Sequence, residues 1–437
     1  MKKKLSKIDI IALVVGSIIG WGSFSLPGTK FLRESGIIGT AIGFLIGGLS
    51  VIFIQAGYHI MMERHSKDGG EFSYAYEHLG RKHGFIVGWS LVLCYLSMIP
   101  LNATALVLVL KQLFGQAISY GYLYTIAGYP VYLSEILIAS AVILLFSSIN
   151  KKGIQVSSFV QNTMVLLLVI NVIVIFVIML FKGNLPQFQA TYVSNYVFSW
   201  KEVLPVVAII PFLFVGFDVV PQVATDLGFS SSKATYFTVG SIGIGTLLYI
   251  LLNTITGLVY TPDQAGQLNW ATGDAVLEKI GVFGFVLLIL ALIGAVTGGI
   301  NGFFISSSKI VASLSEHHLL PQKYQSKTAE GVLANAIQFV TIVTLIAPWL
   351  GREVILYIVD MSSALAALVY GYVCFISLRY AENKRSWAMC LVGLLMALLF
   401  LVLLLAPFSI SRLSTMSLIL MLAWAVVGYF YYRHHTK

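Results

Sequence analysis

The first hydrophobic stretch of the chain, residues 8–27, is long enough to cross a membrane but is interrupted by glycines near its centre. Gly16, Gly20 and Gly22 fall within seven residues, and each glycine inside a helix costs about 1 kcal/mol relative to alanine. A break in a lipid-exposed helix also leaves backbone N–H and C=O groups unpaired, at several kcal/mol each. We therefore expect this break to line a polar cavity inside the protein.

A later hydrophobic stretch carries a similar interruption. Residues 212–218 read Phe-Leu-Phe-Val-Gly-Phe-Asp and lie between Pro211 and Pro221. Paired interruptions at corresponding places in two halves of a membrane protein indicate the substrate site of a transporter. The alternative is glycines that serve close packing between helices, and two matched interruptions favour the substrate site over this alternative.

The composition is typical of a chain that spans a membrane several times. It is 58% hydrophobic and 10% charged, whereas a soluble domain carries about 25% charged residues. The net charge of +9 does not indicate nucleic-acid binding, because the basic residues are scattered between hydrophobic stretches. Cys94, Cys374 and Cys390 lie in apolar stretches without metal-ligand spacing. We expect no metal site, no cofactor and no nucleic-acid partner.

A helix needs about 20 apolar residues to span a bilayer. Twelve stretches have roughly this length: residues 8–32, 37–62, 84–111, 133–149, 154–182, 202–226, 234–260, 282–311, 332–350, 353–378, 388–406 and 413–432. The sequence thus predicts an all-α membrane protein of twelve transmembrane helices. Basic residues such as Lys151, Lys152, Lys384 and Arg385 gather in alternate connections. Because cytoplasmic loops are rich in Lys and Arg, we expect a plasma-membrane protein with both termini in the cytoplasm.

An odd number of helices in each half gives the two halves opposite orientations. Helices one to five (residues 1–200) start inside and helices six to ten (residues 201–385) start outside, which predicts an inverted repeat with a site near the midplane. Helices eleven and twelve (residues 386–437) have no charged residue in their apolar stretches. We expect them to serve as scaffold or dimer contact, and both a monomer and a homodimer remain open.

The two interruptions offer backbone groups of opposite polarity. A helix that restarts near Gly20 presents free N–H groups, which favour an anion. The helix ends that precede the two breaks present unpaired carbonyls, which favour a cation. A ligand with a carboxylate and an ammonium group on one carbon matches this pattern, so the sequence predicts an amino acid or a related amine.

Five motifs resemble those of the amino acid–polyamine–organocation (APC) superfamily and occur in the same order. They are VGSIIGWGSFSLPG, DGGEFSYAYEHLG, INKKGIQVSSFVQN, PFLFVGFDVVPQVATDLG and SSSKIVASLSEHHLLP. The resemblance covers roughly residues 8–385 and implies a LeuT-like 5+5 inverted repeat with helices one and six broken. It also implies a secondary active transporter that moves an amino acid by alternating access, through ion-coupled symport or exchange. An amine or polyamine carrier of the same superfamily is the alternative.

The resemblance assigns substrate-binding positions around both breaks. They are Ser17, Ile18, Gly20, Trp21 and Gly22 in the first helix, and Phe212, Phe214, Val215, Gly216 and Asp218 in the sixth. Phe212 falls where the superfamily has an aromatic gate over the ligand. Trp21 replaces a commonly small residue, so its indole either narrows the pocket or points away. By counting from Gly153, Leu168 falls where many proton-coupled relatives carry a lysine.

Polar side chains inside the apolar stretches are further candidates, because a charge near the bilayer centre costs a few kcal/mol. Asp218 either holds a proton, faces the substrate ammonium group or caps the break. Asp360 either senses protons, forms an outer gate or contacts water. Asn102 follows Pro100, and it either contacts the substrate or binds the carbonyl that the proline leaves free.

Sodium is the other candidate coupling ion. Thr297 and Asn301 fall where LeuT-like proteins hold sodium against the first helix, and carbonyls of Gly16 and Ile19 would add oxygen ligands. Hydrogen bonds between helices, worth about 0.6 kcal/mol per pair, explain the same residues. The sequence leaves coupling to H⁺ or Na⁺ and uncoupled exchange open.

Three other function classes lack their expected patterns. A channel predicts a repeated filter or rings of charged residues. A membrane enzyme needs a converging His/Asp metal cluster or a Ser–His pair, and an ATP-driven protein carries GxxxxGK[ST]. The sequence shows none of these patterns, and we expect a transporter rather than an enzyme.

Overall fold

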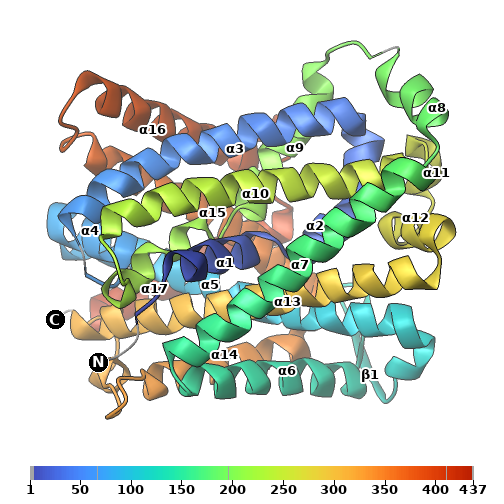
Figure 1. The fold of residues 1–437 in the computed structure, drawn as a ribbon. Coiled ribbons are helices and arrows are strands. Elements are labelled where there is room, and N and C mark those ends of the chain that lie inside the picture. Colours follow the sequence, from blue (N-terminus) through green and yellow to red (C-terminus); the bar gives the residue numbers. More distant parts are fainter. Residues whose placement is uncertain (1–3, 66, 195, 410, 436–437) are drawn as a thin grey trace.

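The computed structural model describes residues 4–65, 67–194, 196–409 and 411–435, and long helices run side by side across the view in Figure 1. Lys2, Lys3 and Lys437, which contribute to the excess of basic residues on the expected cytoplasmic side, lie outside the described residues. The α-helices are α1 (Lys7–Ile18), α2 (Trp21–Leu26), α3 (Leu32–Arg64), α4 (Gly70–Leu79), α5 (Arg81–Phe114), α6 (Leu133–Lys151), α7 (Ile154–Lys182), α8 (Leu185–Phe188), α9 (Trp200–Leu213), α10 (Ser231–Gly257), α11 (Pro262–Gly266), α12 (Ala271–Ile280), α13 (Val282–Glu316), α14 (Ala334–Ile346), α15 (Gly351–Ser377), α16 (Lys384–Leu405) and α17 (Thr415–His435).

Short elements connect these helices. Strands β1 (Tyr122–Ile126) and β2 (Tyr129–Tyr132) form an antiparallel hairpin that the hydrophobic pattern did not predict. The tighter or wider helical turns are η1 (Pro27–Phe31), η2 (Gly115–Ile118), η3 (Gln189–Val193), η4 (Phe217–Val219), η5 (Pro221–Asp226), η6 (Gln322–Gln325) and η7 (Ala347–Leu350).

Ten helical stretches of the described residues are long and apolar enough to cross a membrane, against twelve expected. The expected first span is divided after α1, which has only 12 residues. The stretch after it runs from Trp21 to Arg64 and is kinked at Gly36 (φ 61°, ψ −159°), between the expected spans 8–32 and 37–62. The expected spans at 332–350 and 353–378 fall in one stretch, Ala334–Ser377, but Gly351 (φ 74°, ψ 158°) interrupts the helix between them. The multi-span, all-helical character is confirmed, while the twelve-helix repeat and its residue boundaries stay predictions.

Both interrupted helices begin with a side-chain cap. Ser6 and Asp9 form a capping box at α1, in which Ser6 N–H donates to Asp9 Oδ2 at 2.7 Å and Asp9 N–H donates to Ser6 Oγ at 3.3 Å. Ser199 Oγ accepts from Lys201 N–H at the start of α9. Such caps are worth about 1 kcal/mol each, so both helices have a fixed start before they reach their breaks.

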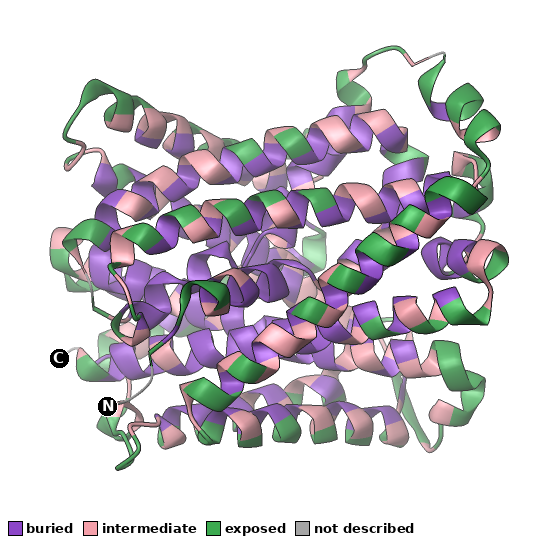
Figure 2. Ribbon diagram, in the orientation of Figure 1, coloured by how far each residue is buried: buried purple, intermediate pink, exposed green. Residues whose placement is uncertain are grey.

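Buried residues gather at the centre of the bundle and exposed residues on its outer helices (Figure 2). Helix α1 packs against α7, α10 and α13, and most of its residues after Asp9 are buried. The outward side of α7 instead exposes large apolar side chains, including Phe159, Leu166 and Phe181. A soluble protein rarely exposes so continuous an apolar surface, so this side faces lipid.

The two ends of the bundle differ. We call the end that carries the start of α1, helix α4 and the end of α13 the N-terminal face; it lies on the left in Figure 1. The opposite face carries α11, α12 and the β-hairpin, on the right. The interruptions after Ile18 and Leu213 lie between these faces, inside the bundle.

Candidate substrate-binding site

Helix α1 ends at Ile18, and the chain becomes extended before α2 begins. Ile19 has φ −93° and ψ 112°, and Gly20 has φ −129° and ψ −161°. Ser23 is the first residue of α2 whose N–H is bonded, to Gly20 O at 3.2 Å. Within the described chain the N–H groups of Trp21 and Gly22 make no hydrogen bond, as expected at the start of a helix. They form a pair of free donors in the middle of the protein.

Helix α9 ends at Leu213, and the second break follows it. Gly216 has φ +119°, a conformation that only glycine adopts without strain. A Cβ added to Gly216 would meet Ser17 Cβ and lie 3.1 Å from Ser17 O. The two breaks therefore touch, backbone against backbone, at Gly216 and Ser17.

A tyrosine of α10 joins the two helix ends. The Tyr249 hydroxyl lies 3.2 Å from Ile18 O and 3.4 Å from Leu213 O. It can donate its proton to either carbonyl, so it partly satisfies the last turns of α1 and α9. The rings of Phe214 and Tyr249 pack at 6.0 Å between centroids, which fixes the hydroxyl in place.

The side chain of Asp218 folds back and hydrogen-bonds to the backbone of the second break. Its Oδ1 accepts from Gly216 N–H at 2.8 Å, and its Oδ2 accepts from the Tyr95 hydroxyl of α5 at 3.0 Å. The side chain is fully buried. Both carboxylate oxygens are thus engaged by the protein itself, and Val215 beside them is buried as well.

Aromatic side chains cover the start of α2. Trp21 is half-buried and stacks on Trp270 at 6.2 Å between centroids, and Trp270 Nε1 donates to Phe24 O at 3.0 Å. The indole of Trp21 therefore leans toward the residues before α12. Phe212 is half-buried, and its Cε1 would lie 3.9 Å from a Cβ added to Gly22.

Asn102 of α5 lies against the other side of the first break. Its Nδ2 donates to Met98 O at 2.9 Å on its own helix. Its Oδ1 would lie 3.0 Å from a Cβ added to Gly20, and its Nδ2 2.9 Å from one added to Gly299. The amide thus occupies the gap that two glycines leave between α1, α5 and α13.

The sequence profile of the amino acid permease family matches residues 5–430, nearly the whole chain. The chain belongs to this family. A putative arginine/ornithine antiporter of Escherichia coli (strain K12) is 24% identical over 421 residues, which cover 90% of this chain and 86% of the relative. A branched-chain amino acid permease of Bacillus subtilis (strain 168) is 24% identical over 483 residues, covering 100% and 94%.

A third relative carries a different name: a methylthioribose transporter of the same Bacillus strain is 24% identical over 319 residues, covering 68% of this chain and 66% of its own. The family match confirms the resemblance to APC permeases. The permease is an amino acid transporter and not an enzyme.

The permease has a cluster of amides where the sequence placed a candidate sodium site. Asn301 Nδ2 of α13 donates to Gln161 Oε1 of α7 at 2.8 Å, and Asn301 Oδ1 accepts from Asn150 Nδ2 of α6 at 3.0 Å. Gln161 Nε2 donates to Ala12 O of α1 at 3.1 Å and lies against Gly16. Gly16 and Asn301 are therefore brought together through Gln161, which occupies the space between them.

The other coupling candidates do not join this cluster. Thr297 Oγ1 donates to Ile293 O one turn earlier on its own helix. Ile19 is buried, and its N–H donates to Val15 O at 3.0 Å. Asp360 of α15 is half-buried and makes no hydrogen bond or ion pair within the described residues. Leu168 is buried against α13.

An ion-pair cluster lies at the N-terminal face of the permease. Lys309 Nζ of α13 lies 2.8 Å from Asp68 Oδ2 and 2.5 Å from Asp226 Oδ2. Asp68 Oδ1 also accepts from the N–H and the hydroxyl of Thr225, at 2.9 and 2.8 Å. We call these four residues the N-terminal latch, because they tie the turn before α4 to η5 and α13.

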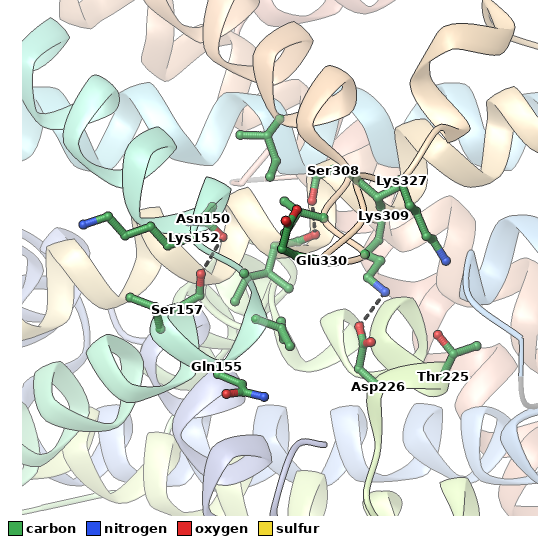
Figure 3. Close-up of a pocket in the computed structure, with 18 of the residues that line it drawn as sticks. Asn150, Lys152, Gln155, Ser157, Thr225, Asp226, Ser308, Lys309, Lys327 and Glu330 are labelled. Atoms are coloured by element: carbon green, nitrogen blue, oxygen red, sulfur yellow. Dashed lines mark hydrogen bonds and ion pairs between the residues drawn. The ribbon is translucent and has the colours of Figure 1, made fainter. Parts of the chain in front are cut away.

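A cavity of about 500 Å³ lies beside the latch, between the ends of α6 and α13 and the starts of α7 and α14. Figure 3 shows Lys309 turned toward Asp226, while Lys152 and Lys327 extend away from the centre of the cavity. Ser157 and Asn150 line its inner part. The cavity therefore reaches from the N-terminal face to the amide cluster.

Several residues at the site were missed from the sequence. Tyr95 and Tyr249 are ordinary members of apolar stretches, and nothing local distinguishes them from packing tyrosines. Gln161 lay inside a motif that resembles the superfamily, and a glutamine in an apolar stretch was a usable signal. Lys309 also lay inside a motif that resembles the superfamily, but its ion pairs were not predicted, because Asp68 and Asp226 are distant in sequence.

Proposed function

We propose that the permease binds the carboxylate and ammonium groups of an amino acid where its two breaks meet, and moves it by alternating access. The observation that carries this proposal is the contact of Gly216 with Ser17 beside the free N–H groups of Trp21 and Gly22. Free N–H groups favour the carboxylate. The carbonyl ends of α1 and α9, at Ile18 and Leu213, favour the ammonium group.

We propose a neutral rather than a cationic amino acid as the substrate. The acidic residue at the break, Asp218, has both oxygens engaged by Gly216 and Tyr95, so it is not directed at a positively charged side chain. The side chains over α2 are aromatic, namely Trp21 and Phe212. The relatives' names include arginine and ornithine, which are cationic, and branched-chain amino acids. The engaged carboxylate of Asp218 and the aromatic side chains favour the branched-chain class.

We propose that sodium is not the coupling ion. Sodium needs several converging oxygens, but Asn301 Oδ1 and Gln161 Oε1 accept hydrogen bonds from neighbouring amides. The N–H donor of Gln161 is aimed at Ala12 O, the kind of carbonyl that would otherwise be a ligand. Exchange and proton coupling both remain compatible with this arrangement.

The N-terminal face is proposed to be cytoplasmic in the plasma membrane. Lys4, Lys152, Lys309 and Lys327 all line the cavity at this face, and cytoplasmic surfaces are enriched in basic residues. Opening of the latch would then release substrate into the cytoplasm or accept it from there.

Gly22→Leu tests the substrate site. A Cβ at position 22 makes only ordinary contacts, at 3.5 Å or more, so the variant should fold while its side chain fills the site. Ligand binding stabilises a protein by RT ln(1 + [L]/Kd), about 2.7 kcal/mol at a hundredfold excess over Kd. We expect neutral amino acids to raise the melting temperature of the purified permease and to leave Gly22→Leu unchanged.

Gly243→Leu is the matched control, because Gly243 is exposed on α10 with no atom within 4 Å of an added Cβ. It should respond to amino acids like the unaltered permease. A full response in Gly22→Leu would contradict the proposed site, and a response to arginine or ornithine alone would contradict the neutral substrate.

A further inference from the structure

Helix α4 carries a buried carboxyl group that the substrate site does not use. Glu71 is only 1% exposed, and its Oε2 accepts from Gln222 Nε2 of η5 at 2.6 Å. Close approach of the two elements depends on Gly70, which has φ +44°. A Cβ there would lie 2.8 Å from Pro221 Cβ and 2.9 Å from Gln222 Nε2. Glu71 thus lies at a tight contact just inside the N-terminal latch.

Asp218 lies four residues before Gln222 and provides a second buried carboxyl group. Its two oxygens both accept hydrogen bonds, from Gly216 and Tyr95, and such bonds favour the ionised form. Glu71 differs, because within the described chain its Oε1 has no hydrogen-bond partner. Of the two carboxyl groups, Glu71 is the one with an oxygen available for a proton.

No cation of the described residues lies within ion-pair distance of either carboxyl group. The titratable groups that act on this pair are tyrosines and a thiol: Tyr58 of α3, Tyr74 of α4, Cys94 and Tyr95 of α5, and Tyr370 of α15. From α13, Lys309 is paired with Asp68 and Asp226, and the ring of His317 packs on Phe72 and Tyr76. At the far end of α4, Glu77 and His78 bond to His65.

Two buried carboxylates without a cation are costly, and neutralising one removes most of that cost. Burial raises the pKa of Glu71 well above its ordinary range, and the Asp218 carboxylate raises it further. The hydrogen-bond donors around Glu71, namely the backbone, Tyr58 and Gln222, lower its pKa but do not offset these two effects. The lack of a nearby cation and the unpaired Oε1 therefore both indicate that Glu71 carries a proton in this arrangement.

We propose that Glu71 is a proton-binding residue of the transport cycle: its Oε1 holds a proton while the N-terminal face is closed and releases it to water when α4 and η5 separate. This inference rests on the alternating access proposed above. Glu71 does not touch the substrate site, so it acts as a positioning residue that controls opening of one face.

The sign of the pH effect follows from linkage. The closed state binds the proton more tightly than the open state, so protons stabilise closure and, reciprocally, closure takes up a proton. Between the pKa values of Glu71 in the two states, the ratio of closed to open permease falls by up to about tenfold for each unit that pH rises. Alkaline conditions on the N-terminal side should therefore favour opening.

A reporter cysteine at position 313 measures this opening. Ser313 of α13 is 2% exposed, its Oγ contacts the backbone region of Gly69 beside α4, and that oxygen has no hydrogen-bond partner within the described residues. Ser313→Cys therefore removes no hydrogen bond and becomes accessible when α4 moves away. The rate of its reaction with a water-soluble maleimide is measured on the full chain over a series of pH values.

Two controls correct the rates. The exposed Ser326→Cys gives the intrinsic pH dependence of a thiol, and the chain without a reporter gives the background from the three buried native cysteines. After this correction we expect Ser313→Cys to react faster as pH rises. With Glu71→Gln added, the rate should stay at the low value seen in acid, because an amide remains neutral at every pH.

Glu77→Gln is the matched variant, since Glu77 is the exposed glutamate of the same helix; it should keep the pH dependence, as should Glu71→Asp. An unaltered pH dependence in Glu71→Gln would overturn the inference. If Glu71→Gln does not fold, Gln222→Leu serves instead. It removes the hydrogen bond that favours the ionised form, so the midpoint should move to higher pH, and an unmoved midpoint overturns the inference.

The labelling needs no amino acid, so the two proposals fail separately. A permease that keeps this pH dependence but shows no stabilisation by any amino acid contradicts the proposed substrate site alone. A permease that binds amino acids but labels at a pH-independent rate contradicts the role of Glu71 alone.

Discussion

The permease contains two buried polar clusters that differ in how completely their polar atoms are hydrogen-bonded. The amide cluster of Asn150, Gln161 and Asn301 is neutral, and these side chains bond to one another and to backbone carbonyls across α1, α6, α7 and α13. The carboxyl cluster of Glu71 and Asp218 leaves Glu71 Oε1 without a partner among the described residues. A fully paired neutral cluster holds helices together at any pH, whereas an unpaired carboxyl group makes the contact between α4 and η5 depend on protons.

The comparison extends to the ends of the bundle. The N-terminal latch uses full charges, with Lys309 held between Asp68 and Asp226. On the other side of the breaks, the start of α2 is instead covered by aromatic side chains, with Trp21 stacked on Trp270. Charged contacts respond to pH and salt and aromatic contacts do not, so regulation is expected on the N-terminal side.

The largest effect should come from Lys309→Met. The lysine side chain is 12% exposed, and its loss leaves two aspartates side by side without a cation. Removing one partner of a buried ion pair costs about 3–5 kcal/mol. We expect a clearly lower melting temperature and faster labelling of Ser313→Cys at every pH. Lys279→Met, which removes the partly exposed pair of Lys279 with its sequence neighbour Glu278, should change neither quantity; equal effects in both variants would contradict the latch.

Tyr95→Phe should have the next largest effect. It removes the hydroxyl that donates to Asp218 Oδ2, and a hydrogen bond to a charged group is worth about 1.5–3 kcal/mol. The melting temperature should fall, and stabilisation by amino acids should weaken because the second break loses its support. Tyr429→Phe, at an exposed position, is the control. An unchanged response in Tyr95→Phe would show that Asp218 does not organise the break.

Asn301→Ala should lower stability by about 1–3 kcal/mol, because it leaves the amides of Asn150 and Gln161 without their partner in a buried place. Unlike Glu71→Gln, it should leave the pH dependence of labelling at position 313 unchanged. Chemical denaturation and the labelling assay measure the two quantities. Loss of the pH dependence in Asn301→Ala would mean that the two clusters are not independent.

The smallest expected effect is that of sodium. Replacing choline chloride with sodium chloride at equal concentration should change neither the melting temperature nor its response to amino acids. The reason is that Gln161 and Asn301 already use their oxygens as acceptors. A sodium-dependent shift that disappears in Asn301→Ala would instead place a sodium ion in the amide cluster.

Local sequence patterns predicted much of the site, but they did not predict which distant residues contact it. Glycine spacing located the first break, and Gly216 between two prolines located the second; α1 does end at Ile18 and α9 at Leu213. Counting along helix five led to Leu168, whereas the residue that reaches Gly16 is Gln161, two turns earlier. The difference arises because a helix turns through about 100° per residue, so a small error in its starting point or tilt points a different side chain at the neighbour.

Helix number was less certain than helix position. Hydropathy located the apolar stretches, but it did not show how they connect. The stretches Trp21–Arg64 and Ala334–Ser377 are each interrupted by a glycine with non-helical backbone angles, Gly36 and Gly351. Such connections depend on the backbone angles at single residues, which local composition leaves undecided.

The sequence by itself determined that this chain is a multi-span membrane protein of the APC type with two interrupted helices. Hydrophobic length and glycine placement act within a single segment, so they are visible without the fold. Only the tertiary structure decided that Glu71 meets Gln222, that Lys309 joins Asp68 to Asp226, and that Gln161 fills the space beside Gly16. These pairs are separated by roughly 80 to 240 residues, and the rotation and packing of whole helices brings them together.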